Sequence, residues 1–154
     1  MSATSADLRD LYRQVVLDHS RNPRNRHRPE HVDRQAEGHN PLCGDKVQVF
    51  VQADGEKLEV AFEASGCAIC VASASLMTEA SSGLPETEVR RLAGQFESSL
   101  ATGSDGLPGE LAALGGVSAY PARIRCATLP WRTLLAALDS APAPVTTEPT
   151  TSAG

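Results

Sequence analysis

The clearest pattern of hydrophobic and polar positions alternates with a period of two, over residues 46–53 and again over 56–64. Asp54-Gly55 lies between these runs, and Asp-Gly between alternating segments is typical of a two-residue hairpin turn of type I′. The pattern therefore predicts an antiparallel hairpin in which Ala53 pairs with Glu56. In that register three apolar pairs share one face: Val51–Leu58, Val49–Val60 and Val47–Phe62.

The open end of this predicted hairpin carries the candidate chemistry. Extended outward, the same ladder sets Asp45 opposite Ala64 and Cys43 opposite Gly66, and Cys67 follows directly. We therefore expect Cys43, Asp45 and Cys67 to lie close together.

Helical spacing of apolar residues predicts helices around the hairpin. They are expected at residues 5–19, 67–82 (a stretch rich in small residues), 86–100 and 109–114, with a last helix that starts just after Cys126, has Pro130 in its first turn and buries Trp131. A third strand near residues 32–37 would widen the sheet. We therefore predict an α+β fold, a small antiparallel sheet with helices packed on one face.

The 154 residues are typical of one domain. We expect a short N-terminal tail over residues 1–6 and one domain over residues 7–139. Residues 140–154 consist largely of Ala, Pro, Thr and Ser and offer little apolar surface to bury, which predicts a disordered tail.

Composition and charge narrow the function classes. The net charge of −5 argues against general nucleic-acid binding, which needs a concentrated basic surface. The sequence contains no apolar run of membrane-spanning length and no secretory signal, so we expect a cytoplasmic protein with no membrane partner. In that reducing compartment four cysteines indicate metal binding or thiol chemistry more than disulfides.

Cys67 and Cys126 are both predicted at helix starts, where the helix dipole favours a thiolate. With Cys43 and the carboxylate of Asp45, they would complete a tetrahedral zinc site of three sulfurs and one oxygen. Spacing alone leaves buried structural cysteines as an equal alternative. The convergence predicted from the hairpin favours the metal site.

Several motifs in this order resemble the IscU/SufU (NifU N-terminal-like) proteins of iron–sulfur cluster assembly. They are NPLCGD at residues 40–45, SGCAI at 65–69 and RIRCATL at 123–129, preceded by LYRQVVLDH at 11–19 and NPRN at 22–25. The resemblance extends over about residues 7–139. It implies the IscU/SufU-like fold.

Two features favour the SufU branch of that family. Arg125 stands directly before Cys126, where the scaffold branch has a histidine, and residues 84–117 resemble the longer insertion typical of SufU. The resemblance implies zinc held by Cys43, Asp45, Cys67 and Cys126.

By the same resemblance, Cys43 accepts sulfur as a persulfide from a PLP-dependent, SufS-like cysteine desulfurase and stimulates that enzyme. A histidine of the desulfurase then takes the place of Cys43 on the zinc. The chain would act as a sulfurtransferase in the sense of a relay, with downstream iron–sulfur assembly proteins as further partners. Arg125 is a candidate for stabilising the persulfide, or else an ordinary surface arginine.

Three alternatives remain open. The same ligands could hold a transient [2Fe–2S] cluster on a scaffold protein. Cys67 and Cys70 form a CxxC pair that could serve a thiol–disulfide oxidoreductase, although a small buried side chain is the simpler expectation for Cys70. A binding module with a purely structural zinc is the third. His39 lies near the site in sequence and is expected to be a solvated loop residue.

Overall fold

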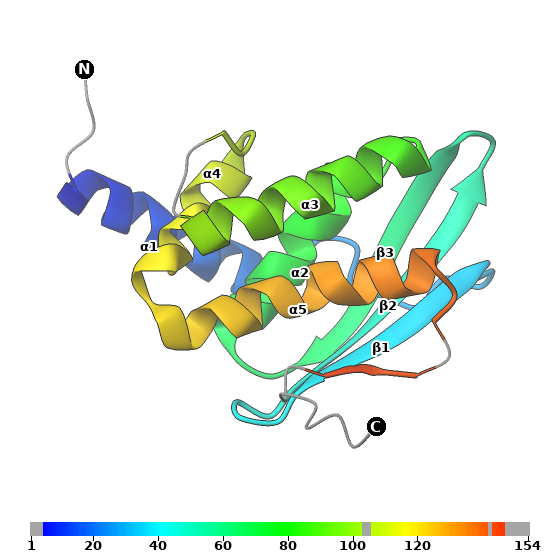
Figure 1. Ribbon diagram of the computed structural model, residues 1–154, viewed down its shortest axis with the longest axis horizontal. Helices are drawn as coiled ribbons and strands as arrows, with labels where there is room; N and C mark the ends of the chain where they lie inside the picture. The colour runs from blue at the N-terminus through cyan, green and yellow to red at the C-terminus, as the bar shows by residue number, and fades with distance from the viewer. Residues whose placement is uncertain (1–4, 103–105, 142, 147–154) are drawn as a thin grey trace.

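The computed structural model describes residues 5–102, 106–141 and 143–146. Over these residues, four strands form one sheet in the order β3-β2-β1-β4, and the helices lie on one face of it (Figure 1). The strands are β1 (Arg34–Asn40), β2 (Asp45–Asp54), β3 (Lys57–Ser65) and β4 (Val145–Thr146). The helices are α1 (Ser5–Arg21), α2 (Ala68–Ser81), α3 (Glu86–Thr102), α4 (Glu110–Leu114), the 3-10 helix η1 (Gly115–Ala119) and α5 (Pro121–Leu138). The predicted α+β fold is confirmed.

The β2–β3 hairpin forms, but its register differs by two residues from the predicted one. Asp54 pairs with Lys57 and Val47 with Ala64, so the predicted pairs Ala53–Glu56 and Asp45–Ala64 are wrong. The turn residues are Gly55 and Glu56, and of these only Gly55 has a positive φ (64°), as in a type II′ turn. Because the shift is even, every side chain keeps its predicted face, and the apolar row still points to the helices.

The core lies between this apolar row and the helices. Its sheet side consists of Val47, Val49, Val51, Leu58, Val60 and Phe62, all buried. Trp131 of α5 is fully buried, as predicted, and stacks on Phe96 of α3 at 4.5 Å between ring centroids. Its indole Nε1 donates to Ser73 Oγ (3.1 Å), and Ser73 in turn donates to the carbonyl of Ala127. The small side chains of α2 therefore let α2 and α5 approach closely.

The last helix begins earlier than predicted. It starts at Pro121, a residue favoured in the first helical turn because its missing N–H would have no partner there. Cys126 consequently lies inside α5, and the prediction that it stands at a helix start is wrong. Pro130 lies in the helix interior, where it cannot donate the usual hydrogen bond to the carbonyl of Cys126.

Two other elements differ in extent from the predictions. The third strand is present at Arg34–Asn40, so it overlaps the expected residues 32–37 but begins two residues later and ends three residues later. Within the predicted disordered tail, Val145–Thr146 pair in parallel with Gly38 and His39 of β1, while residues 142 and 147–154 lie outside the described part. None of the helices in the described ranges is long and apolar enough to cross a membrane.

Gly66 joins β3 to α2 at the end of the sheet where β2 starts. Its φ is 141°, a conformation that favours glycine. A Cβ at this position would overlap the carboxylate of Asp45 and would lie 2.8 Å from the Asp45 Cα. The absent side chain is therefore what lets the start of β2 and the start of α2 meet.

We predict that Gly66→Ala lowers the free energy of unfolding by about 1–3 kcal/mol, because backbone strain and a clash with Asp45 add up. Urea denaturation of the metal-free protein measures the change. Gly94→Ala is the matched control: Gly94 lies in α3 with open space around it, so alanine there should stabilise the protein by up to about 1 kcal/mol. Equal effects of the two substitutions would contradict this account.

Candidate metal centre

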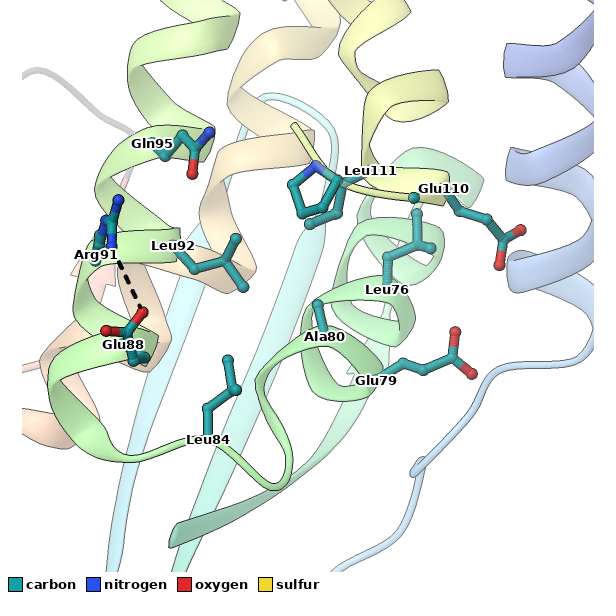
Figure 2. Close-up of a pocket in the computed structure, with 12 residues that line it drawn as sticks. Leu76, Glu79, Ala80, Leu84, Glu88, Arg91, Leu92, Gln95, Glu110 and Leu111 are labelled. Atoms are coloured by element: carbon teal, nitrogen blue, oxygen red, sulfur yellow. Dashed lines mark ion pairs between the residues drawn. The ribbon is translucent and has the colours of Figure 1, made fainter. Parts of the chain in front are cut away.

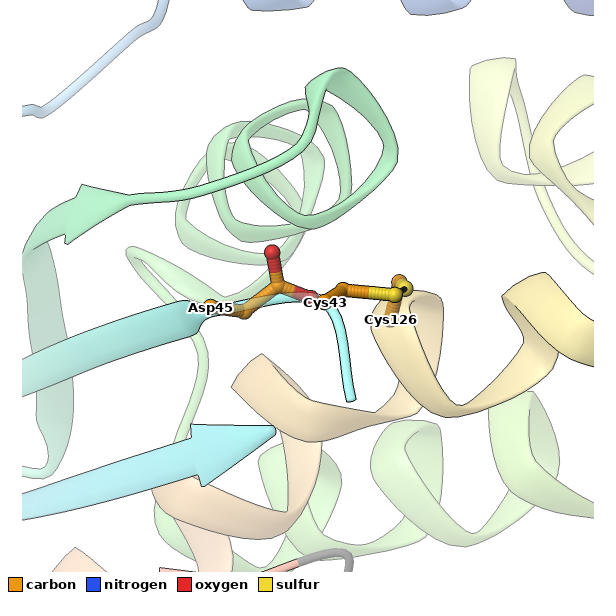
Figure 3. A group of neighbouring side chains, drawn as sticks. All are labelled: Cys43, Asp45 and Cys126. Atoms are coloured by element: carbon orange, nitrogen blue, oxygen red, sulfur yellow. Dashed lines mark hydrogen bonds between the residues drawn. The ribbon is translucent and has the colours of Figure 1, made fainter. Parts of the chain in front are cut away.

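Cys43, Asp45 and Cys126 converge at the end of the sheet where β2 begins (Figure 3). Cys43 lies in the loop between β1 and β2, Asp45 is the first residue of β2, and Cys126 comes from α5. One ligand atom from each lies within 4.8 Å of the other two, and the sulfurs of Cys43 and Cys126 are 3.5 Å apart.

Cys67 borders this group of three. It is the N-cap residue of α2, and its Sγ lies 3.8 Å from Oδ2 of Asp45. The structure therefore brings together the four side chains that the sequence singled out, with Cys67 at the side of the tighter group.

Asp45 is held in place by hydrogen bonds from Cys67 and Asn40. Its side chain is buried, with the residue only 1% exposed. Oδ1 accepts from the backbone N–H of Cys67 (2.8 Å) and Oδ2 accepts from Nδ2 of Asn40 (3.1 Å). The same Asn40 amide also lies 3.4 Å from Cys126 Sγ, to which it donates. A buried carboxylate requires such partners, so Asn40 is a structural part of the centre that the sequence analysis did not single out.

The hydrogen bond between Cys67 and Cys126 shifts the pKa values of the two thiols in opposite directions. It lowers the pKa of Cys67 to about 7, helped by the backbone N–H groups of Cys70 and Ile69 at the start of α2 and opposed by burial and by the charge of Asp45. The same hydrogen bond, together with burial, raises the pKa of Cys126 far above that of a free thiol. The pKa of Cys67 is therefore lowered mainly by Cys126 and further by the start of α2, whereas the pKa of Cys126 inside α5 is raised.

The donor set fits zinc. In a tetrahedral site with Zn–S bonds of about 2.3 Å, two sulfurs stand about 3.8 Å apart, and the 3.5 Å between Cys43 and Cys126 is close to that spacing. Three thiols and one carboxylate also match the ligands that zinc takes in proteins. A cation here would offset the negative charge that Asp45 and the thiolates gather in a largely buried place.

Two arginines of α5 lie beside Cys43. Nη1 of Arg123 donates to Cys43 Sγ (3.7 Å), whereas Arg125, the arginine predicted to act there, lines the hollow next to Cys43. Sequence analysis did not assign a role to Arg123. The sequence feature that could have pointed to Arg123 is its position three residues before Cys126. This spacing puts both residues on one helix face once the helix is known to start at Pro121.

Cys70 agrees with the simpler expectation of a small buried side chain, whereas the expectation that His39 is a solvated loop residue is wrong, because it lies half-buried in β1. Cys70 is fully buried, and burial raises its pKa strongly, so it is not a ready nucleophile. His39 lies on β1 with its Nε2 3.7 Å from a carboxylate oxygen of Glu37.

A second group of possible ligands is formed by Asp18, His19 and Glu110. His19 is fully buried, with Nδ1 2.8 Å from Ser75 Oγ and Nε2 3.3 Å from Glu110 Oε1. The guanidinium of Arg24 donates to Asp18 (2.9 Å) and puts a positive charge where a cation would have to sit. We therefore interpret this group as a polar link between α1, α2 and α4.

A hollow of about 420 Å³ lies between α2, α3 and the start of α4 (Figure 2). Leucine side chains line its inside, and Glu79, Glu88, Arg91 and Glu110 stand around it, with an ion pair between Glu88 and Arg91 at 3.9 Å. Its described lining includes no cysteine or histidine. The hollow therefore offers no thiol or imidazole, and the thiol cluster remains the candidate site.

An α+β fold with three cysteines and one aspartate gathered at the end of its sheet defines a class of small domains with a thiol cluster at the sheet end. Within that class, residues 11–138 match the family model described as NifU-like N terminal domain. The chain therefore belongs to the NifU-like N-terminal family of iron–sulfur cluster assembly proteins, the IscU/SufU relatives that its motifs resemble.

Individual relatives agree with this assignment. The zinc-dependent sulfurtransferase SufU of Bacillus subtilis (strain 168) is 41% identical over 135 residues, which cover 84% of this chain and 90% of the relative. The iron–sulfur cluster assembly scaffold protein IscU of Streptococcus pyogenes serotype M1 is 38% identical over 136 residues, covering 85% and 84%.

Among solved structures, a proposed iron–sulfur cluster assembly scaffold protein for the SUF system from Fervidobacterium islandicum AW-1 superposes with a TM-score of 0.75. The two chains share 31% identity, and the match covers 84% of this chain and 97% of the other. One of these relatives is thus named as a sulfurtransferase, and the other two are named as scaffold proteins.

We predict that Asn40→Ala lowers zinc affinity by about 10- to 100-fold, because the second partner of Asp45 is lost. Competition with a chromogenic chelator measures the affinity. Gln48→Ala removes an exposed amide from the same region of the sheet and should leave the affinity unchanged. An Asn40 variant that binds zinc as tightly as the Gln48 variant would contradict the role of this amide.

In the metal-free protein, alkylation of Cys67 by iodoacetamide should increase with pH around a midpoint of about 7, because the folded protein lowers the pKa of this thiol to about 7. Below that pH the thiol is protonated and slow. Cys126→Ala removes the main hydrogen bond, so the midpoint should move up toward the ordinary thiol value of about 8.5. Mass spectrometry of the peptide containing Cys67 gives the rates, and an unchanged midpoint in the variant would refute the proposed cause.

Proposed function

We propose that this chain is a zinc-dependent sulfur carrier that accepts persulfide sulfur on Cys43 from a PLP-dependent cysteine desulfurase and stimulates that enzyme. One observation carries the proposal: of the group formed by Cys43, Asp45 and Cys126, only Cys43 lies on a loop and is partly exposed. Asp45 and Cys126 are buried in a strand and in a helix. Cys43 is therefore the member of this group of three that can reach another protein, and unlike Cys67, which is also partly exposed, it is not the cap of a helix.

Each residue has a distinct part in this proposal. Cys43, Asp45, Cys67 and Cys126 would hold zinc, which when bound keeps a coordinated thiol deprotonated at neutral pH. Arg123 donates to Cys43 Sγ and places a positive charge beside the sulfur that would carry the persulfide. Arg125 lines the same hollow and adds to that positive potential.

The transfer itself balances without any further reactant. The thiolate of Cys43 attacks the outer sulfur of the persulfide on the desulfurase cysteine. A new S–S bond forms at Cys43, the old S–S bond breaks, and the desulfurase cysteine leaves as a thiolate. The persulfide on Cys43 then passes its outer sulfur to downstream iron–sulfur assembly proteins.

A second candidate function is that of a scaffold on which a [2Fe–2S] cluster is assembled. The scaffold name of the Streptococcus pyogenes relative favours it, and the same cysteines would serve. Arg125 argues against it, because an arginine offers no lone pair for iron at the position next to Cys126. Anaerobic purification separates the two: a colourless protein with one zinc supports the carrier, and a brown protein with iron and sulfide supports the scaffold.

We predict that incubation with a cysteine desulfurase and cysteine adds one or more sulfur atoms to Cys43, as measured by peptide mass spectrometry under non-reducing conditions. Cys43→Ser should lose the added sulfur and the stimulation while remaining folded. Cys70→Ser is the matched control, because a buried thiol that does not join the transfer can be replaced without losing either. Sulfur that appears on Cys67 or Cys70 but not on Cys43 would refute the proposal and favour the oxidoreductase alternative.

A further inference from the structure

Leu42 is the most exposed large hydrophobic side chain of the described residues, at 75% exposure, and it is bonded directly to Cys43. It stands at the edge of an open hollow of about 580 Å³. The hollow is lined by Leu42, Cys43, Pro121, Ala122, Arg123 and Arg125. An apolar side chain held in water beside a candidate transfer residue is typical of a contact made with another protein.

The charges around this hollow have one sign. Its described lining contains two arginines and no acidic residue, although the whole chain has a net charge of −5. Arg123 is engaged with Cys43 through its hydrogen bond. Arg125 is exposed at the same rim, where it can pair with a carboxylate of a partner.

We infer that Leu42 and Arg125 form a two-point docking surface for the segment of the cysteine desulfurase that delivers sulfur. That segment would offer an apolar pocket to Leu42 and a carboxylate to Arg125. The inference rests on the proposed function and adds to it the chemistry of the partner surface. An apolar anchor next to an arginine is a combination common at the energetic centres of protein interfaces.

The position of Leu42 also connects docking with movement of Cys43. The loop between β1 and β2 contains Gly44, which has a φ of 69° and open space around it. Within the loop, the backbone N–H of Cys43 donates to the carbonyl of Asn40, the last residue of β1 (3.2 Å). A partner that buries Leu42 therefore acts on the residue next to the ligand that has to move, while Asp45 and Cys126 stay in their strand and helix.

The first test replaces the apolar anchor. Leu42→Ser should weaken binding to the desulfurase by at least about 10-fold, the loss expected when a buried leucine contact is removed, and should reduce stimulation in parallel. Leu42→Met should keep both. Leu17→Ser, at another exposed leucine on α1, is the matched control and should bind as the unmodified protein does. Zinc content is measured on every variant and should not change.

The second test replaces the charge and leaves the loop untouched. Arg125→Gln should slow association with the desulfurase and make it less sensitive to salt, because an exposed ion pair steers the encounter. Arg91→Gln removes an exposed arginine of α3 and serves as the control. Stopped-flow or surface-binding kinetics at low and moderate ionic strength give both quantities.

The outcomes separate this inference from the proposed function. If Leu42→Ser and Arg125→Gln bind and stimulate like their controls while Cys43→Ser is inactive, the docking surface is wrong and the sulfur carrier stands. If the unmodified protein takes up no sulfur on Cys43, the proposed function fails. Weaker binding confined to the Leu42 and Arg125 variants, with zinc retained, supports the inference.

Discussion

The buried carboxylate of Asp45 is the feature on which the centre depends. It reaches the interior because β2 begins at this residue, and it is stabilised there by the N–H of Cys67 and the amide of Asn40. Gly66 makes the approach possible, since any side chain there would occupy the space of the carboxylate. One aspartate thus joins the start of β2, the end of β1 and the start of α2, and it sets where the thiols can stand.

The negative charge collected around Asp45 explains both the chemistry and its asymmetry. Asp45 and the three thiols lie close together, with Asp45 and Cys126 buried, and negative charge gathered in such a place is stable only with protons or a cation to neutralise it. At Cys126 the neighbouring Cys67 and burial raise the pKa of the thiol and so favour its protonated form. Cys43 differs from the buried members of the group in lying on a loop beside Arg123, and the proposed sulfur carrier depends on this difference.

The β2–β3 hairpin and the start of α5 show how much of the structure can be predicted from the sequence pattern. Period-two alternation placed the correct side chains of the β2–β3 hairpin on the core face, yet the turn residues were off by one position because Asp54-Gly55 and Gly55-Glu56 both satisfy the local turn chemistry. The start of α5 was placed too late because Pro130 was interpreted as a first-turn residue, although the helix accommodates it in its interior. That single error hid Arg123, which lies one turn before Cys126 and contacts Cys43.

The sequence by itself determined the fold class, the family, the core faces of the hairpin and the four side chains of the centre, because periodicity and motif order are local properties of the chain. Only the tertiary structure decided which cysteine has the lowered pKa and which arginine contacts Cys43. It also decided that Asn40 donates a hydrogen bond to Asp45. These depend on contacts between residues as far apart as 40 and 126. Burial and hydrogen-bond direction follow from packing and have no signature in a linear pattern.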